Sequence, residues 1–276
     1  LLISGILRAP LQLLMLVAMT LLSYYYCDGD LTKAFTDPHN LLIIVFIGGG
    51  LFIGQFLAMA ICPALIKKYD VKKIYNLFSG VSAIPFALLF VVYLIAPADL
   101  SKLGWAAIDG VLFFGAGAGF GAVSVCQSVM ISDCIDYEEY HNGYRPDGVF
   151  FSGQSFITKF SAGVASIISA IVYDMVGYSD VNIDAMNKAI ANGANFATDY
   201  AHFSKAMWFL ISIPPAIGMA LAVIPTLKYE IDKESHEKML DVPRHEHSSI
   251  ELTYILRGEA EHTLDGKTTV VRQGDY

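Results

Sequence analysis

Residues 133–159 read DCIDYEEYHNGYRPDGVFFSGQSFITK, a charged segment followed at once by an apolar one that carries a lysine. This segment separates two of six apolar stretches. Each stretch is long enough to cross a hydrocarbon core of about 30 Å as a helix. The stretches run over residues 9–27, 41–65, 74–96, 105–131, 149–173 and 206–228. They predict an all-α membrane domain of six transmembrane helices over residues 1–228.

The composition agrees with a membrane protein. Of the 276 residues, 55% are hydrophobic and 16% are charged, whereas a soluble domain carries about 25% charged residues. The four cysteines lie in or beside apolar stretches without metal-ligand spacing, so we expect them to pack in the core. The net charge of -8 is spread over the loops and the tail, and no nucleic-acid partner is expected. The opening LLISGILRAP lacks an initiator Met and a signal-peptide layout, which we interpret as an internal start.

Basic residues predict the orientation in the membrane. The short loop IKKYDVKK carries four lysines, whereas three lysines are spread over the loops of the other side. By the positive-inside rule, this loop, the Asp133 loop and both termini are cytoplasmic. We therefore expect a multi-pass protein of the cell inner (plasma) membrane. On the outer side, residues 184–203 are predicted to form a short amphipathic helix.

Lys159 is the candidate site residue with the clearest physical argument. A lone ammonium near the middle of a membrane helix costs about 2.5 to 3.5 kcal/mol on insertion scales, so it should face the bundle interior or a wet cavity. On a helix it shares a narrow, small and polar face with Ser152, Ser155, Ala162, Ser166 and Ser169. A packing seam and a binding or transport site both explain this face, and the lysine favours the site.

Other polar residues near Lys159 are weaker candidates. Gln154 and Thr158 lie on neighbouring faces, where they can complete a pocket or bond to the helix backbone. In the preceding stretch, Gln127 is a further substrate-binding candidate. Asp109 lies near the external end, where we expect water to reach it, and it is assigned no role.

Glycines in the preceding stretch predict close helix packing. One stripe of that stretch consists of Gly110, Gly117, Gly121, Ser124 and Ser128. Residues this small let two helices approach closely.

The loop after residue 131 holds acids together with an arginine. Paired carboxylates suggest acid–base chemistry in isolation, but these lie at a helix end without an enclosed cleft. We instead predict a cytoplasmic gating network in which Arg145 and nearby lysines pair with the acids in one transport state. The predicted members are Asp133, Asp136, Tyr137, Glu139 and Arg145. No catalytic constellation occurs in the apolar stretches, so an intramembrane enzyme is not predicted.

The pattern D-C-I-D-Y-E-E-Y-x-x-G-x-R-x-D-G, followed by Q-S-F-I-T-K, resembles a family signature. It is similar to the segment between the tenth and eleventh helices of the glycoside-pentoside-hexuronide:cation symporters, the melibiose-carrier family of the major facilitator superfamily. The family pattern there is close to D-x-x-D-Y-G-E-W-K-T-G-x-R-x-E-G. Residues 24–30, the loop IKKYDVKK and the segment KYEIDKESHEKML also look like family features.

The resemblance implies the C-terminal six-helix half of a secondary transporter that carries a sugar with Na+ or H+ by alternating access. The N-terminal half, where the family holds its cation site, would be a missing partner beside the sugar, the cation and the lipid bilayer. The site positions carried over are Lys159, Gln154 and Ser155. Two departures leave the sugar open: Glu138-Glu139-Tyr140 replaces Gly-Glu-Trp or Gly-Glu-Tyr, and Ser124 stands where some members have an aromatic residue.

The chain changes character after residue 227. Residues 229–242 read as a charged cytoplasmic helix or linker, and residues 243–276 alternate like strands, with turns at Gly258, Asp265-Gly266 and Gly274-Asp275. His245, His247, Glu251 and Gly258 fall in the order H-x-H-x3-E-x6-G.

This order resembles the first motif of the cupins and the N-terminal domain of AraC-type regulators. Two histidines and a glutamate so spaced can bind a divalent metal such as Fe, Mn or Zn. No second cupin motif follows before Tyr276, so we expect a short, truncated β segment. A gene fusion, a mis-joined reading frame and a truncation remain open as its origin. A membrane-tethered sensor with a sugar- or metal-binding tail is the alternative function.

Overall fold

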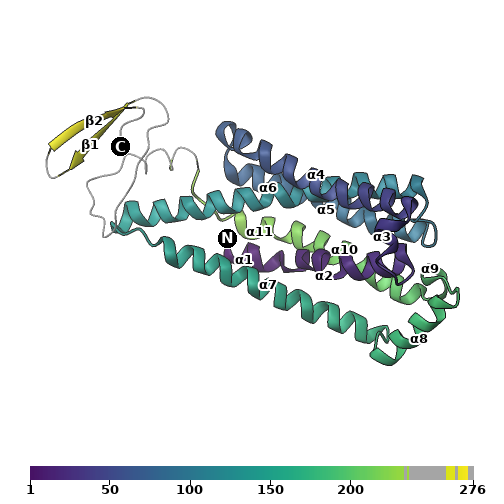
Figure 1. Cartoon of the computed structure of the whole chain (residues 1–276). Helices are drawn as coiled ribbons and strands as arrows, with labels where there is room; N and C mark the ends of the chain where they lie inside the picture. The colour runs from purple at the N-terminus through teal and green to yellow at the C-terminus, as the bar shows by residue number, and fades with distance from the viewer. Residues whose placement is uncertain (233–234, 236–258, 265–266, 273–276) are drawn as a thin grey trace. The chain divides into compact units, whose positions relative to one another are not determined.

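The computed structural model describes residues 1–232, 235, 259–264 and 267–272 (Figure 1). The chain divides into two compact units, Leu1–Leu240 and Asp241–Tyr276. The first unit is helical and the second contains the two described strands. The predicted class, an all-α membrane fold with a short β segment, is confirmed.

Among the described residues, six helical segments are long and apolar enough to cross a membrane. The first, Ala9–Tyr26, combines η1 (Ala9–Leu11), α2 (Gln12–Leu21) and the π-helical η2 (Leu22–Tyr26), and follows α1 (Leu2–Leu7). The others are α4 (Pro38–Lys68), α5 (Val71–Ile95), α6 (Leu103–Asn142), α7 (Asp147–Met175) and Ala201–Thr226, which joins α10 (Ala201–Leu221) to α11 (Val223–Thr226). Short helices α3 (Lys33–Thr36), α8 (Asp180–Ala191) and α9 (Phe196–Asp199) lie in the connections.

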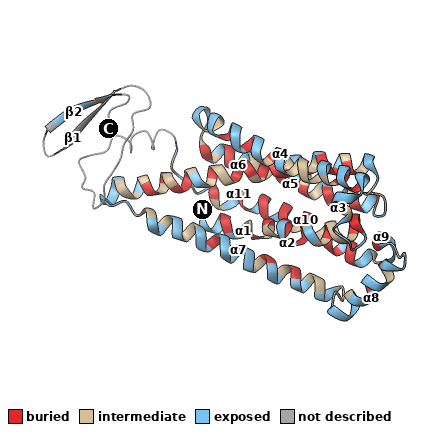
Figure 2. Ribbon diagram, in the orientation of Figure 1, coloured by how far each residue is buried: buried red, intermediate tan, exposed pale blue. Residues whose placement is uncertain are grey.

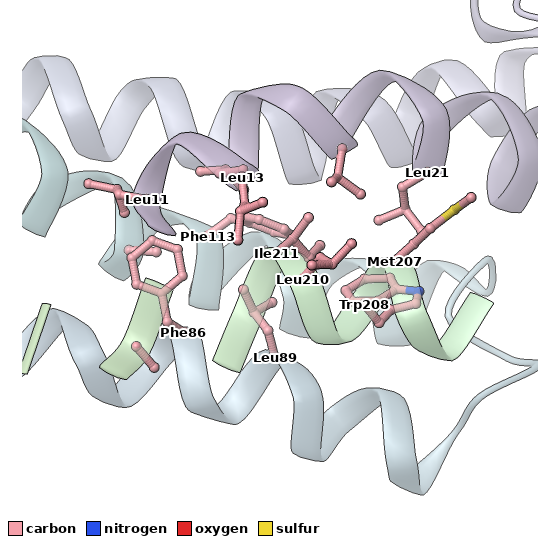
Figure 3. Packing of buried hydrophobic residues seen from close by; sticks show 14 of the residues in the cluster. Leu11, Leu13, Leu21, Phe86, Leu89, Phe113, Met207, Trp208, Leu210 and Ile211 are labelled. Atoms are coloured by element: carbon pink, nitrogen blue, oxygen red, sulfur yellow. The ribbon is translucent and has the colours of Figure 1, made fainter. Parts of the chain in front are cut away.

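The core of the helical unit forms where α10 packs between α2 and α5 (Figure 3). Trp208, Met207 and Leu210 of α10 are fully buried, as are Leu13 of α2 and Leu89 of α5. Trp208 stacks on Tyr93 with 5.8 Å between the ring centroids. Because lipid is as apolar as these side chains, their close van der Waals packing rather than removal from water stabilises the contact. The core thus holds α2, α5 and α10 together.

Glycines set the distance between α4 and α6. A Cβ added to Gly117 would lie 2.1 Å from the carbonyl oxygen of Leu51, and one added to Gly121 would lie 2.3 Å from that of Gln55. Gly54 meets the Phe114 carbonyl in the same way, at 2.1 Å. Side chains cannot be added at such distances without separating the helices. The close packing predicted from the glycine stripe is confirmed, and its partner is α4.

Two connections differ from the sequence prediction. The amphipathic helix exists as α8 but begins at Asp180 and ends at Ala191, because Gly193 adopts a left-handed conformation with φ 96°. Of residues 229–242, predicted as a charged helix or linker, the described residues 229–232 are not helical. Ser235 is helical, and the Asp232 carboxylate accepts hydrogen bonds from its N–H and Oγ, at 2.8 and 2.6 Å. A carboxylate in this position is typical of a helix start.

The second unit contains a β-hairpin. Strands β1 (Glu259–Leu264) and β2 (Lys267–Arg272) pair antiparallel, with His262 opposite Thr269. This agrees with the two strands predicted on either side of Asp265-Gly266. The candidate metal ligands His245, His247 and Glu251 lie outside the described residues.

Candidate functional site

Helix α7 is attached to the bundle by a single narrow face. Its buried residues are Ile157, Ser161, Ala165 and Ser169, each four positions after the last. Residues so spaced lie on one side of a helix. This side contacts α1: the Ser161 hydroxyl donates to the Gly5 carbonyl at 3.5 Å, and a Cβ on Gly5 would lie 2.8 Å from Ile157.

The rest of α7 presents two exposed faces of opposite character (Figure 2). One is the small polar stripe predicted from the sequence. Its exposed members are Ser152, Ser155, Lys159, Ala162 and Ser166. The other is apolar and consists of Phe156, Phe160, Ile167 and Ile171, with the two phenylalanine rings stacked at 6.0 Å. We call these the polar stripe and the apolar stripe of α7.

The polar stripe is no packing seam between helices of the described chain. Ser169 is its one predicted member that is buried; the other five are exposed. In a membrane, the apolar stripe suits lipid, whereas Lys159 on the polar stripe does not. The polar stripe therefore needs an aqueous cavity or another protein surface against it.

Lys159 and Ser155 have no ion pair or hydrogen bond from their side chains within the described residues. Gln154 is half-buried beside them. The Thr158 hydroxyl donates to the backbone carbonyl of Gln154 at 3.0 Å. Thr158 was predicted either to complete a pocket or to bond to the helix backbone, and the structure shows the backbone bond.

The third candidate side chain, Gln127 of α6, is already engaged. Its Oε1 accepts a hydrogen bond from Nη2 of Arg8. The Arg8 guanidinium also lies over the ring of Tyr75, 5.6 Å from its centroid, and its Nε is buried without a hydrogen-bond partner in the described part of the chain. The Tyr75 hydroxyl in turn bonds to Ser4 at 2.5 Å. The structure thus assembles Arg8, Tyr75 and Gln127 from three helices.

Sequence reasoning missed Arg8. The predicted first stretch began at residue 9, which left Arg8 just outside the membrane. In the structure, Arg8 is the turn residue between α1 and η1, so helical residues precede it as well as follow it. The argument applied to Lys159, that a cation among apolar residues needs a reason, would have found it.

At the loop end of the bundle, Arg145 forms ion pairs with three carboxylates. Its Nη1 lies 2.8 Å from Asp136 and 2.6 Å from Glu139, and its Nε lies 3.2 Å from Asp147. Partial burial disfavours the charged guanidinium, but the hydrogen bonds that it donates to Glu139 and Asp136 outweigh this effect and raise the pKa of Arg145. The loop acids and Arg145 therefore form one charged cluster in this conformation.

The other predicted network members lie beside this cluster. Asp133 is buried and accepts a hydrogen bond from the Tyr229 hydroxyl at 3.0 Å. Burial and the nearby Asp133 charge raise the pKa of Tyr229. The ring of Tyr137 stacks on His141 at 4.1 Å. Asp133 therefore connects α6 to the segment after α11. The ion pairs of Arg145 are with Asp136, Glu139 and Asp147 instead.

Two of the lysines expected to pair with the loop acids bond elsewhere. Lys73 forms an ion pair with Asp70 at 2.5 Å. Lys72 donates to the carbonyls of Leu227 and Tyr229, at 2.9 and 2.6 Å. These lysines therefore bond to their own loop and to the end of the last membrane segment.

The environment of Asp109 differs from the sequence prediction that water would reach it. Its side chain is fully buried rather than wetted, and neither carboxyl oxygen has a hydrogen-bond partner within the described residues. The sequence prediction failed because Asp109, in the second turn of α6, is covered by packing against other helices, which local periodicity does not show. The Tyr25 and Tyr26 hydroxyls of η2 lie within electrostatic range of it.

Comparison with known proteins gives two family matches. The description "MFS/sugar transport protein" matches residues 3–233, and "Cupin domain" matches residues 236–276. An isoprimeverose transporter of Lactiplantibacillus pentosus is 30% identical over 125 residues, which are 45% of this chain and 23% of that protein. The uncharacterized symporter YjmB of Bacillus subtilis (strain 168) is 21% identical over 239 residues, 84% of this chain and 46% of that protein. The chain therefore spans less than half the length of these relatives.

Proposed function

Because the chain belongs to the MFS/sugar transport protein family, we propose that it acts as the C-terminal six-helix half of a cation-coupled sugar symporter. The observation that carries this proposal is the polar stripe of α7, which leaves an ammonium exposed in a membrane helix without a partner in the described chain. A second six-helix body facing this stripe would enclose the cavity that Lys159 requires. Two relatives named as a transporter and a symporter support the same activity.

In this proposal the substrate is a glycoside, pentoside or hexuronide. Sugar hydroxyls are hydrogen-bond donors and acceptors, so they suit the Lys159 ammonium, the Ser155 hydroxyl and the Gln154 amide. Arg8 holds Gln127 in place and supplies a second cation close to the same helices. The coupling Na+ or H+ would bind mainly in the other half.

Alternating access requires contacts that form in one state and break in another. The Arg145 cluster is our candidate for such a contact, because it joins the end of α6 to the start of α7 through Asp136, Glu139 and Asp147. We place this end of the bundle, with both termini, in the cytoplasm, and the protein in the inner membrane. The lysine-rich loop supports that orientation.

The proposal is tested by sugar uptake. The gene product that contains these residues is expressed in cells without their own sugar symporters. Uptake of labelled glycosides, pentosides and hexuronides is then measured with an imposed Na+ or proton gradient. We expect gradient-dependent accumulation of one sugar class, and a loss of about tenfold or more in Lys159→Gln, equivalent to 1.4 kcal/mol.

Lys188→Gln is the matched control, since it removes the same charge from exposed helix α8 outside the membrane segments. Failure of every gradient to drive accumulation would contradict the symporter function. Equal uptake by Lys159→Gln and Lys188→Gln would contradict the role of Lys159 alone.

The alternative, a membrane-tethered sensor, is favoured by one observation, the cupin match over residues 236–276. Its candidate ligand set for a divalent metal, His245, His247 and Glu251, stays a prediction. In that function the tail binds the ligand and the helices respond. The symporter is preferred because the family match covers most of the helical unit and explains the polar stripe.

A further inference from the structure

Asp109 is a buried carboxyl group that the proposed transport function does not use. Its side chain has no exposed surface, and neither Oδ1 nor Oδ2 has a partner within the described residues. An ionised carboxylate taken out of water without a partner costs several kcal/mol, so such groups take up a proton instead. Asp109 therefore differs from Asp136, Glu139 and Asp147, which are paired with Arg145.

The surroundings of Asp109 supply hydroxyls and no cation. Tyr25 and Tyr26 of η2 lie close enough for a charge on Asp109 to act on them; the Tyr26 hydroxyl is buried without a partner in the described chain, while that of Tyr25 donates to the Pro97 carbonyl at 2.7 Å. On α5, which packs against α6, the Tyr93 hydroxyl donates to the Ala201 carbonyl at 3.4 Å. On α4, which also packs against α6, exposed His39 bonds to the Ser101 carbonyl at 2.8 Å. No ion pair joins Asp109 to a lysine, arginine or histidine of the described residues.

The backbone beside Asp109 is unusual. The first membrane segment changes from α-helix to π-helix at Leu22–Tyr26, the turn that holds both tyrosines. Short π-helical turns inside α-helices occur frequently at functional sites because they re-aim side chains. Here the turn ends in two tyrosines within electrostatic range of Asp109.

A cavity borders the same turn. It measures about 300 Å³ and lies between the first membrane segment, α4, α6 and α10. Tyr26, Trp208 and Phe113 line it, and Phe113 is one helical turn after Asp109. The Trp208 Nε1, like the Tyr26 hydroxyl, has no hydrogen-bond partner in the described chain. Both polar atoms are buried, and Asp109 itself is not among the residues that line the cavity.

We propose that Asp109 is a proton-binding site of the membrane domain, protonated in this closed bundle, with the Tyr26 hydroxyl as its neighbour. The site is separate from the polar stripe of α7 and from the coupling site expected in another half. With this site, the described half of the molecule binds a proton independently of the coupling site. The proposal does not depend on sugar transport, and its test does not measure transport.

Infrared spectroscopy of the purified protein in lipid tests the site directly. A protonated carboxylic acid has a carbonyl stretch apart from that of a carboxylate. We expect such a band at neutral pH, its loss in Asp109→Asn, and its persistence in Asp99→Asn. Asp99 is the matched control because it is half-exposed and paired with Lys102 at 2.9 Å. Tyr26→Phe is expected to shift the band without abolishing it.

Thermal unfolding provides a second measurement. A proton bound by the folded state and lost on unfolding makes stability fall as pH rises, once pH exceeds about 5, where an unfolded aspartate is ionised. As pH is raised, we expect the unfolding temperature of the parent protein to fall relative to that of Asp109→Asn. A band that survives in Asp109→Asn, or no band together with a constant difference between the two proteins, would overturn the proposal. An unshifted band in Tyr26→Phe would remove Tyr26 from it.

Discussion

Arg8 shows how a single cation is accommodated inside a helical membrane domain. Its guanidinium has an amide acceptor in Gln127 and an aromatic face in Tyr75, and both come from other helices. A hydrogen bond to a charged group contributes about 1.5 to 3 kcal/mol, more than a neutral one. The arrangement thus stabilises the junction of the first segment with α5 and α6.

Replacing Gln127 by Leu should destabilise the protein. The buried guanidinium then loses its acceptor, and we expect a cost of about 2 kcal/mol in the free energy of unfolding. The measurement is thermal unfolding in detergent. Ser128→Ala is the control, since the exposed Ser128 hydroxyl bonds only to the Ser124 carbonyl one turn earlier. Equal stability of the two variants would show that Arg8 does not need Gln127.

At the scale of one helix, α7 carries three different environments on one cylinder. One face is buried against the first segment, one is the apolar stripe and one is the polar stripe. A helix in contact with lipid on all its exposed surface would not carry a lysine and three hydroxyls there. The three faces of α7 therefore indicate three surroundings: the bundle, lipid, and either water or another protein surface.

Cysteine labelling in native membranes tests this division. In a Cys134→Ser background, we expect Ala162→Cys to react with a charged thiol reagent at least about tenfold faster than Ile167→Cys. Water reaches the polar stripe, whereas lipid covers the apolar one. The three remaining native cysteines are buried and should stay unlabelled. Similar rates at both positions would contradict the assignment of the faces.

The α4–α6 pair depends on glycine at the helix contact. Gly117→Ala places a methyl group against the Leu51 carbonyl, and we expect a loss of about 1 to 3 kcal/mol from overpacking. Gly80→Ala, in α5, is the matched control because nothing lies within 4 Å of the added Cβ. That change should stabilise its helix by about 0.5 to 1 kcal/mol. Unfolding measurements that give both variants the same sign would disprove the packing argument.

At the scale of the whole molecule, the chain combines a membrane unit with a second unit from a different family. If the symporter function holds, deletion of residues 241–276 should leave sugar uptake within about twofold of the full chain. In the proposed function the sugar site lies in the helical unit, so we expect the tail to contribute no group to it. A sensor, by contrast, would lose its response to the ligand on deletion. Uptake and ligand response measured on the same two proteins separate the functions.

The fold class could be predicted from the sequence, because runs of about 20 apolar residues are typical of helices that span a membrane. The sequence also identified Lys159 and the Arg145 loop, since a charge inside or between such runs is visible without coordinates. The glycine stripe was equally readable, although the sequence did not say which helix it meets.

Which charged residues are paired, which are exposed and which are buried without a partner among the described residues depends on how the helices pack. Gln127 has Arg8 as a partner, Lys159 has none among the described residues, and Asp109 is sealed from water. These outcomes depend on contacts between residues far apart in the chain, such as Arg8 with Gln127. Local periodicity assigns a residue to a helix face, but the packing of the other helices determines what that face meets.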